Sequence, residues 1–373
     1  MGAAESALGR VENQSELSMA ALASREALAE AGLTLKDVDG LFVNYMGQEG
    51  SVQVGEYLGI EPRYSDSSDL GGAAFEAFVH HAMLAVHSGH CDVALITYAS
   101  RQRSRKSRPM ALTEDDQSLM GQFELPYGLP APIGHYALAA ARHMHEYGTT
   151  PEQLAEVAVA ARAWAALNPK AWAREPLTVA DVLATPMMCD PLRKLDCCLR
   201  TDGGGAIVIA GKDHARNAAK RAIRVIGVGE SQRAWNIAQS RDLTSTPGAA
   251  AGRHAFAMAG IAPSDVDVFE PYDCFTIAVL LHLEDLGFCE RGGAGEFAKS
   301  GALRPGGKLP SMTSGGGLSY CHPGALGLLL LVEAVRQLRG EAGARQVPDA
   351  KIAVAHGIGG VLSTSATVVL ARD

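Results

Sequence analysis

Two stretches of the chain show the same order of apolar and polar positions. Residues 26–39 predict the end of a helix, a glycine at Gly32, a short acidic turn and the start of an apolar strand. Residues 254–267 repeat this order without gaps around Gly260. A glycine directly after a helical pattern is typical of a helix C-cap. Two copies roughly 230 positions apart indicate that the chain consists of two similar halves.

Each copy is followed by a glycine-rich turn, an apolar helix and a buried strand. In the first half this order covers residues 71–98 and ends in a predicted strand from Val93 to Tyr98. In the second half it covers residues 315–356 and ends in a predicted strand from Ile352 to Ala355. Such alternation predicts an α/β fold with a mostly parallel sheet and helices on both faces.

The region from residue 101 to about residue 200 interrupts this order. Its composition is irregular, and it contains a predicted helix from His135 to Tyr147. These features predict an inserted cap or loop domain. We therefore expect an N-terminal half, 1–210, that includes the insertion and ends with the strand Gly205 to Ile209, followed by a C-terminal half, 211–373.

Composition excludes some kinds of partner. The chain has 373 residues, of which 47% are hydrophobic, and a net charge of −8. No basic cluster alternates with aromatic residues, so nucleic acid is not expected as a partner. The one basic stretch, 101–108, is interpreted as a solvated loop, with contact to the phosphates of a ligand as the alternative.

Cysteine usage and apolar runs suggest a location. The seven cysteines are odd in number and form no CxxC pair, which argues against a disulfide framework or a structural zinc site. The N-terminus lacks the pattern of a secretion signal, and no uncharged apolar run approaches the length that spans a membrane. We expect a soluble protein of the reducing cytoplasm that binds no metal.

A histidine late in the chain is a candidate for chemistry. His322 is followed by Pro323, lies within the glycine-rich run 314–327, and precedes a predicted helix from Leu328 to Leu338. The proline limits the backbone, and the helix start carries positive dipole charge. His322 is therefore well placed to donate a hydrogen bond to a developing oxyanion.

This stretch resembles the GHP block of the thiolase superfamily, in its sterol-carrier-protein thiolase branch. Residues 331–347 and 351–360 are also similar to the end of those proteins, and the likeness covers nearly the whole chain. The resemblance implies the thiolase fold. In that fold two duplicated βαβαβαββ halves form a five-layer αβαβα core with an inserted loop domain, and the protein is a homodimer.

The departures from the thiolase pattern carry the functional prediction. Residues 69–75 read DLGGAAF, without cysteine, serine or threonine, and the position of the family's nucleophilic cysteine falls on or beside Gly72. Thiolysis needs an acyl acceptor, which glycine and alanine cannot provide. Tyr272 stands where the branch usually has a histidine, and Tyr320 and Cys321 stand where a lysine and a glycine are common.

This combination resembles the thiolase-like aldolases of bacterial steroid side-chain degradation. The resemblance implies a lyase that cleaves a 3-hydroxyacyl-CoA by a retro-aldol reaction. The implied substrate is a 17-hydroxy steroid side-chain CoA thioester, which would give a 17-ketosteroid and propionyl-CoA. It also implies a small partner protein with an OB-fold and a zinc ribbon, and no bound cofactor.

Seven residues are assigned to the predicted site. Tyr272 and Tyr320 are expected to act as acid and base, since a tyrosine hydroxyl can do so when its pKa is lowered from about 10. The alternative is that each only packs its ring. His322 is expected to stabilise the thioester enolate. It is expected to be aided by His356 or by backbone amides near Gly72 and Gly357. His356 falls where many thiolases have a second cysteine. Cys274 is either an acid or base or a relic.

Two other functions remain open on the sequence. One is an acetyl-CoA acyltransferase, a thiolase that would use Cys274 or Cys321 as the acyl acceptor. The other is a non-catalytic, thiolase-like subunit that binds acyl-CoA or lipid and supports a partner enzyme.

Overall fold

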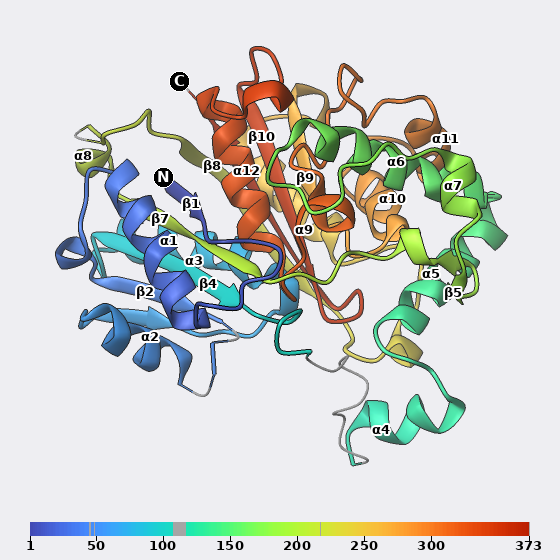
Figure 1. Cartoon of the computed structure of the whole chain (residues 1–373), viewed down its shortest axis with the longest axis horizontal. Coiled ribbons are helices and arrows are strands. Elements are labelled where there is room, and N and C mark those ends of the chain that lie inside the picture. The colour runs from blue at the N-terminus through green and yellow to red at the C-terminus, as the bar shows by residue number, and fades with distance from the viewer. Residues whose placement is uncertain (45, 48, 107–116, 217, 373) are drawn as a thin grey trace.

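We analysed a computed structural model of the chain, which describes residues 1–44, 46–47, 49–106, 117–216 and 218–372. Its two large sheets, one formed by each half, are separated by a layer of helices (Figure 1). The predicted strands and helices of the repeated segments are present. Among the described residues no helix is both long and apolar enough to cross a membrane.

The first half has the predicted βαβαβαββ order. Its five strands are arranged in the sheet as β1-β7-β4-β2-β3. The strands are β1 (Gly2–Glu5), β2 (Gly40–Val43), β3 (Tyr64–Asp66), β4 (Val93–Ser100) and β7 (Gly203–Ala210), and the helices between them are α1 (Glu16–Glu30), α2 (Gly50–Leu58) and α3 (Ala74–His87).

The second half repeats this arrangement, but the counterpart of β3 is only a single β-bridge. Its sheet has the order β8-β11-β10-β9. Where the first half has β3, the second half has a single bridge between Phe269 and Ser311. Pro310 precedes Ser311 and has no N–H to donate, so the ladder cannot extend there. The elements are β8 (Arg224–Gln232), α9 (Gly248–Ala259), β9 (Val268–Pro271), α10 (Thr276–Asp285), α11 (Ala294–Lys299), α12 (Gly327–Arg339), β10 (Ile352–Gly359) and β11 (Thr364–Ala371).

The prediction of mostly parallel sheets is wrong, because both sheets are mixed. The strands β2, β3 and β4 are parallel to one another, as are β9 and β10. The last strand of each half, β7 or β11, pairs antiparallel with both of its neighbours. β11 follows β10 after four residues, and so short a connection permits only an antiparallel pair.

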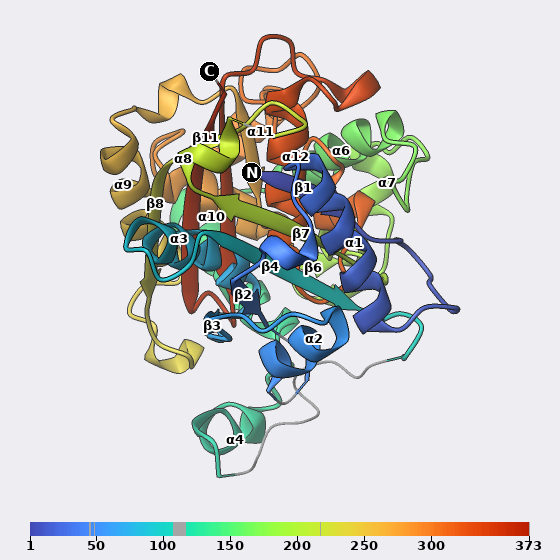
Figure 2. The same cartoon turned by 90° about the vertical axis from the view of Figure 1, so that its left-hand side faces the viewer.

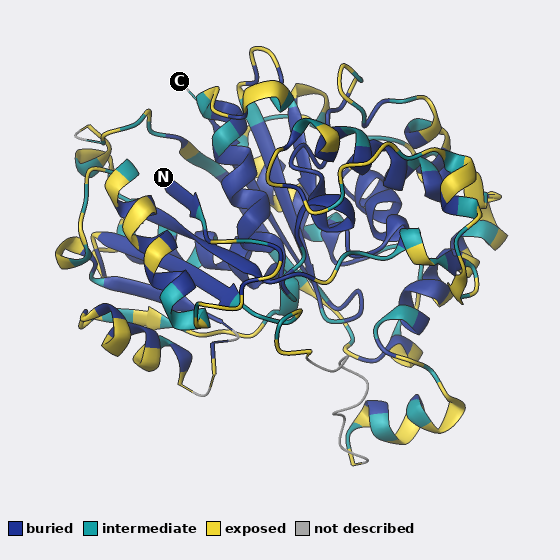
Figure 3. Cartoon of the chain, in the orientation of Figure 1, coloured by how far each residue is buried: buried dark blue, intermediate teal, exposed yellow. Residues whose placement is uncertain are grey.

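The layers follow the predicted five-layer order (Figure 2). α3 and α12 contact strands of both sheets and form the central layer, α1 and α2 cover the outside of the first sheet, and α9 covers the outside of the second. Leu328, Leu329, Leu330 and Leu331 of α12 are all buried. A helix that is apolar on every side belongs between two sheets, and the burial map shows the same contrast between central and outer helices (Figure 3).

The described part of the segment between β4 and β7 carries four α-helices and a two-stranded sheet. α5 and α6 lie against the second half, while α4 projects away from the body (Figure 1). Residues 107–116 of this segment lie outside the described residues. Its elements are α4 (Leu119–Phe123), α5 (Ile133–Tyr147), α6 (Pro151–Leu167), α7 (Val179–Leu183), β5 (Met187–Cys189) and β6 (Leu192–Arg193), and α8 (Lys212–Ala215) follows β7.

Candidate active site

Tyr272 fills the space beside Gly72. Gly72 lies in the turn that leads into α3, and a Cβ at this position would stand 2.5 Å from Tyr272 Cε2, 2.6 Å from Tyr272 Cζ and 2.5 Å from the Ile358 carbonyl oxygen. Separations below 3 Å are overlaps. No side chain can therefore project from residue 72 while the ring of Tyr272 is in place.

Hydrogen bonds hold Tyr272 at this position. Its backbone N–H donates to the His356 carbonyl oxygen at 2.9 Å. Its hydroxyl accepts a hydrogen bond from the Leu326 N–H at 3.1 Å, just before α12, and lies 3.5 Å from the Gly324 carbonyl oxygen. The phenol oxygen thus faces the N-terminal end of α12, where the unpaired amides and the helix dipole favour negative charge.

His322 packs against Tyr272 from the glycine-rich loop. The two rings are edge to face, with centroids 5.6 Å apart. Although part of the residue reaches the surface, Nε2 is buried and has no hydrogen-bond partner among the described residues. Burial lowers the pKa of the imidazole to about 4, so His322 is neutral at physiological pH and can present an N–H to a ligand oxygen.

Asp273 fixes the loop that carries His322. Its buried carboxylate accepts hydrogen bonds from the Gly317 N–H at 2.6 Å and the Leu318 N–H at 3.0 Å. These residues belong to a π-helical turn, Gly316–Tyr320. A side chain at Gly316 or Gly317 would meet this carboxylate, which explains the glycines at both positions. Burial raises the pKa of Asp273 to about 7.

Tyr320 lies at the end of the same turn but has different surroundings from Tyr272. Its side chain is buried, and the charged groups nearest to it are Glu5, Glu333 and Arg345. Burial raises the pKa of this phenol well above 10. The Tyr272 hydroxyl instead contacts the backbone of Gly324 and Leu326.

The His356 side chain lies on the opposite face of β10 from Gly357. The His356 ring packs edge to face on His282, with centroids 4.5 Å apart, and Nδ1 lies 2.8 Å from Thr367 Oγ1. Successive residues of a strand point to opposite faces. It is therefore Gly357 that faces α3, and a Cβ there would stand 2.8 Å from the Ala73 Cα.

Both candidate cysteines are buried thiols with raised pKa values. Burial raises the pKa of Cys274 to about 12, and it does the same for Cys321. Cys321 Sγ lies 3.1 Å from Thr201 Oγ1. The nucleophilic form of cysteine is the thiolate, which neither residue would populate at neutral pH.

Tyr136 is a site residue that the sequence analysis missed. The ring of this buried tyrosine of α5 packs on Phe275, the residue after Cys274, at a centroid distance of 4.5 Å. Burial raises the pKa of its phenol well above 10. In the sequence, Tyr136 is only one residue of a predicted helix. Nothing in the local pattern indicates that this helix packs against the loop after β9.

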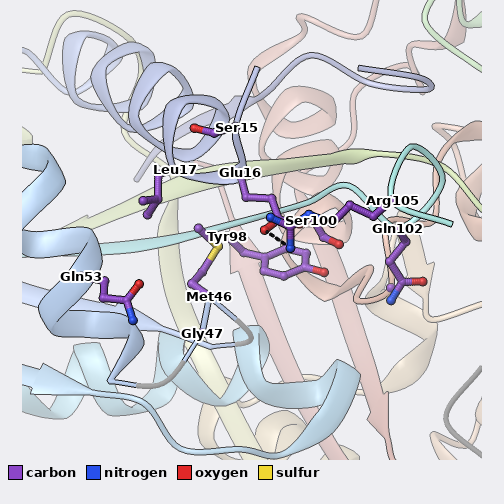
Figure 4. A pocket seen from close by; sticks show the side chains of 11 residues that line it. Ser15, Glu16, Leu17, Met46, Gly47, Gln53, Tyr98, Ser100, Gln102 and Arg105 are labelled. Carbon is purple, nitrogen blue, oxygen red and sulfur yellow. Dashed lines mark ion pairs between the residues drawn. The ribbon is translucent and has the colours of Figure 1, made fainter. Parts of the chain in front are cut away.

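A cavity of roughly 660 Å³ borders the Gly324 loop (Figure 4). It lies at the carboxyl ends of β2 and β4, where open α/β sheets commonly bind ligands. Arg105, from the basic stretch 101–108, lines it and forms an ion pair with Glu16 at 3.1 Å. Residues 107–108 of that stretch lie outside the described residues. Other lining residues are Ser15, Leu17, Met46, Gly47, Gln53, Tyr98, Ser100 and Gln102.

No metal centre is evident in the part of the chain that the structure describes. Within it, no three histidine, cysteine or acidic side chains are grouped so that they could hold an ion.

Fold and site together define a thiolase-fold protein without a nucleophile at the start of α3. Residues 229–372 match the family model described as thiolase C-terminal domain-like. A solved structure described as Ltp2-ChsH2(DUF35) aldolase aligns with a TM-score of 0.91 and 32% sequence identity, covering 100% of this chain and 97% of that chain.

Two curated relatives cover most of the chain. The 17-hydroxy-3-oxo-4-pregnene-20-carboxyl-CoA lyase of Mycobacterium tuberculosis is 37% identical over 88% of this chain and 87% of that protein. The acetyl-CoA acetyltransferase of Methanothermobacter thermautotrophicus is 33% identical over 100% of this chain and 98% of that protein. The chain belongs to the thiolase superfamily, and the resemblance identified from its motifs is confirmed.

Proposed function

We propose that the protein is a carbon–carbon lyase that cleaves a 3-hydroxyacyl-CoA by a retro-aldol reaction. The proposed substrate is a 17-hydroxy steroid side-chain CoA thioester, and the products are a 17-ketosteroid and propionyl-CoA. The observation that carries the proposal is the Tyr272 ring in the space beside Gly72. Support for the substrate comes from the relatives that are named as a pregnene-carboxyl-CoA lyase and a steroid side-chain-cleaving aldolase.

The chemistry of the substrate accounts for the absent nucleophile. A tertiary alcohol cannot be oxidised to the ketone that thiolysis requires. Retro-aldol cleavage releases a finished ketone and a thioester enolate, and no acyl group has to be captured. The enzyme needs a base for the hydroxyl proton, a donor to the enolate oxygen and an acid for the enolate carbon.

Two residues take the first two of these roles, the base and the donor to the enolate oxygen. Tyr272 is proposed to accept the proton of the 3-hydroxyl, since its oxygen already receives the Leu326 N–H and faces the helix start. His322 is proposed to donate to the enolate oxygen from Nε2, which has no partner among the described residues. Backbone amides near Gly72 and Gly357 are proposed as further donors. Tyr320, the second tyrosine expected from the sequence to act as acid or base, remains a candidate for the acid.

The thiolase alternative has less support. It requires Cys274 or Cys321 as the acyl acceptor, and burial raises the pKa of each thiol to about 12. The other alternative, a non-catalytic subunit, would bind acyl-CoA tightly without turnover when its partners are supplied.

The proposal includes partners and a location. β3 is the edge strand of the first sheet and pairs only with β2 in the described chain, so a second copy is proposed to pair there. The solved structure described as Ltp2-ChsH2(DUF35) aldolase supports a second, small protein partner, for which we propose the OB-fold and zinc ribbon. No bound cofactor is proposed. All seven cysteines are free, as expected for the proposed cytoplasmic location.

The deciding experiment measures propionyl-CoA released from a 17-hydroxylated steroid-22-oyl-CoA, with the partner protein present, with and without free CoA. Release that is independent of free CoA is the expected result. Release that requires free CoA would indicate thiolysis, and binding without release would favour the non-catalytic subunit.

A further inference from the structure

Glu76 is a buried carboxyl group one helical turn after Gly72. Its residue is 1% exposed, and neither carboxyl oxygen has a hydrogen-bond partner among the described residues. Side chains of a helix lean toward its N-terminus, and residues four apart share a face. The carboxyl of Glu76 therefore leans along α3 toward Gly72.

Glycines on two other elements make room for this carboxyl. A Cβ on Gly357 of β10, or on Gly327 of α12, would overlap Glu76 Oε2. The same Cβ on Gly327 would stand 2.6 Å from the Gly72 carbonyl oxygen. Glu76 thus lies where the starts of α3 and α12 meet β10. Its carboxyl fills the volume into which residues 327 and 357 would otherwise project.

Glu76 and Tyr272 are linked through the backbone at the start of α12. Leu326, whose N–H donates to the Tyr272 hydroxyl, directly precedes Gly327. The two groups therefore meet consecutive residues at the start of one helix. The Tyr272 ring occupies the space into which a Cβ on Gly72 would project. The Glu76 carboxyl occupies the space into which Cβ atoms on Gly327 of α12 and Gly357 of β10 would project.

A carboxyl in this place is not explained by folding. An unpaired polar group in the interior destabilises the folded state. α12 and β10 approach it with the glycines Gly327 and Gly357, and α3 approaches with Ala73. Among the described residues no charged partner shifts its titration. Burial raises the pKa of Glu76 to about 8, against a smaller lowering by its own backbone N–H, and this value suits a group that both accepts and returns a proton near neutral pH.

We propose that Glu76 is a catalytic acid–base group that delivers the proton to the enolate carbon. This inference rests on the proposed retro-aldol function. As the 3-hydroxyl proton moves to the Tyr272 oxygen, the phenol's own proton moves to the Glu76 carboxylate, directly or through one water. The bond between the second and third carbons breaks, and its electron pair remains on the second carbon as the enolate.

The cycle closes without another reactant. The Glu76 carboxyl returns its proton to the second carbon, which gives the acyl-CoA product and restores the carboxylate. The proton lost from oxygen is replaced on carbon, so atoms and charge balance. The same group can run the last step backward and remove a proton from the second carbon of propionyl-CoA.

This reverse step provides a test that needs no steroid. Wild-type protein, with its partner, is incubated with propionyl-CoA in D2O, and deuterium at the second carbon is measured by mass spectrometry across pH. Wild type should exchange, with a rate that rises through a limb near pH 8. Glu76→Gln should lower exchange and steroid cleavage at least about a hundredfold, with propionyl-CoA affinity changed less than about threefold. Glu230→Gln, which alters a paired carboxylate of β8 beside α3, is the control and should exchange like wild type.

The possible outcomes distinguish the proposed role of Glu76 from the proposed lyase function. If wild type cleaves the steroid thioester and Glu76→Gln does so within threefold, the role of Glu76 is overturned and the lyase function stands. If wild type exchanges but cleaves no steroid thioester, the substrate is wrong, and exchange by Glu76→Gln still decides the role of Glu76. If Glu76→Gln fails to fold, Glu76→Asp retains an acid and should keep a weaker, pH-dependent exchange. A flat pH profile in that variant would overturn the proposal.

Discussion

The ring of Tyr272 and a side chain at residue 72 exclude each other, since a Cβ on Gly72 would stand 2.5 Å from Tyr272 Cε2. Two departures from the thiolase pattern that are 200 positions apart in the sequence are therefore one structural change. The ring could enter only where residue 72 has no side chain.

This relationship predicts a coupling between the two positions. Gly72→Cys should destabilise the wild-type protein by about 1–3 kcal/mol through overpacking. In a Tyr272→His background the cost should fall by at least about 0.5 kcal/mol. Part of it should remain, because the Cβ also meets the Ile358 carbonyl oxygen. Urea unfolding of the four proteins measures the coupling, and strictly additive free energies would show that the two residues do not compete for space.

Tyr272→Phe removes the hydroxyl and keeps the ring. We expect kcat to fall at least about a hundredfold, the lower range for loss of a general base. Stability should fall by about 1–3 kcal/mol, since the buried Leu326 N–H loses its acceptor. Tyr127→Phe is a matched control on a tyrosine that is 86% exposed, and it should leave both quantities unchanged. Near-normal turnover by Tyr272→Phe would remove this residue from the mechanism.

His322→Ala removes the proposed donor to the enolate oxygen. Loss of one such donor lowers kcat by about a hundredfold to a thousandfold. KM should change much less, because the donor acts mainly when charge develops on the oxygen. Steady-state kinetics separates the two parameters. A rise in KM at constant kcat would instead make His322 a binding residue.

Cys274→Ala and Cys321→Ala test the thiolase alternative. Because burial raises the pKa of both thiols to about 12, we expect neither to be labelled by acyl-CoA at pH 7. Each variant should keep turnover within about threefold of wild type. An acylated peptide containing either residue, found by mass spectrometry, would be direct support for thiolysis.

The pH dependence of stability gives a separate test of Glu76. Its pKa is about 8 when folded, above the value of about 4.3 for an unfolded glutamate. Between these values the unfolded chain releases a proton that the folded chain keeps, so this group's contribution to stability falls as pH rises. The slope is at most about 1.4 kcal/mol per pH unit.

Glu76→Gln does not titrate at this position and should therefore gain stability relative to wild type from pH 5 to pH 8. The difference in unfolding free energy between the two proteins is the quantity to measure. It cancels the contributions of His282 and His322, whose lowered pKa values act in the opposite sense. A difference that does not change with pH would mean that Glu76 is ionised in the folded protein.

Local patterns predicted the elements of the fold but not their pairing. The repeated helix, glycine and strand at residues 26–39 and 254–267 appear as α1 with β2 and as α9 with β9, because capping and periodicity act within a few residues. The antiparallel last strands were missed, since strand direction depends on how distant segments meet. Proline at residue 310 was visible in the sequence, and its effect became clear only once Ser311 was placed beside Phe269.

For the site, too, the sequence indicated individual residues but not how they are arranged in space. Local reading identified Gly72, Tyr272 and His322, which come together, and it named both His356 and Gly357 without showing that their side-chain positions lie on opposite faces of β10. A shift of one residue in a strand reverses the face, and only the packed sheet sets it. Glu76 was missed because an acidic residue in the first turn of a helix is usually explained by the helix dipole at the surface.

By itself the sequence determined the family and the absence of a nucleophile at the start of α3, because these depend on residue types in local order. The five-layer architecture followed from the resemblance to that family. The tertiary structure alone decided that Tyr272 fills the space beside Gly72, that His356 points away and that Glu76 is enclosed between Gly327 and Gly357. Which side chains share one small volume depends on contacts between distant segments, and those contacts exist only once both sheets have packed on α3 and α12.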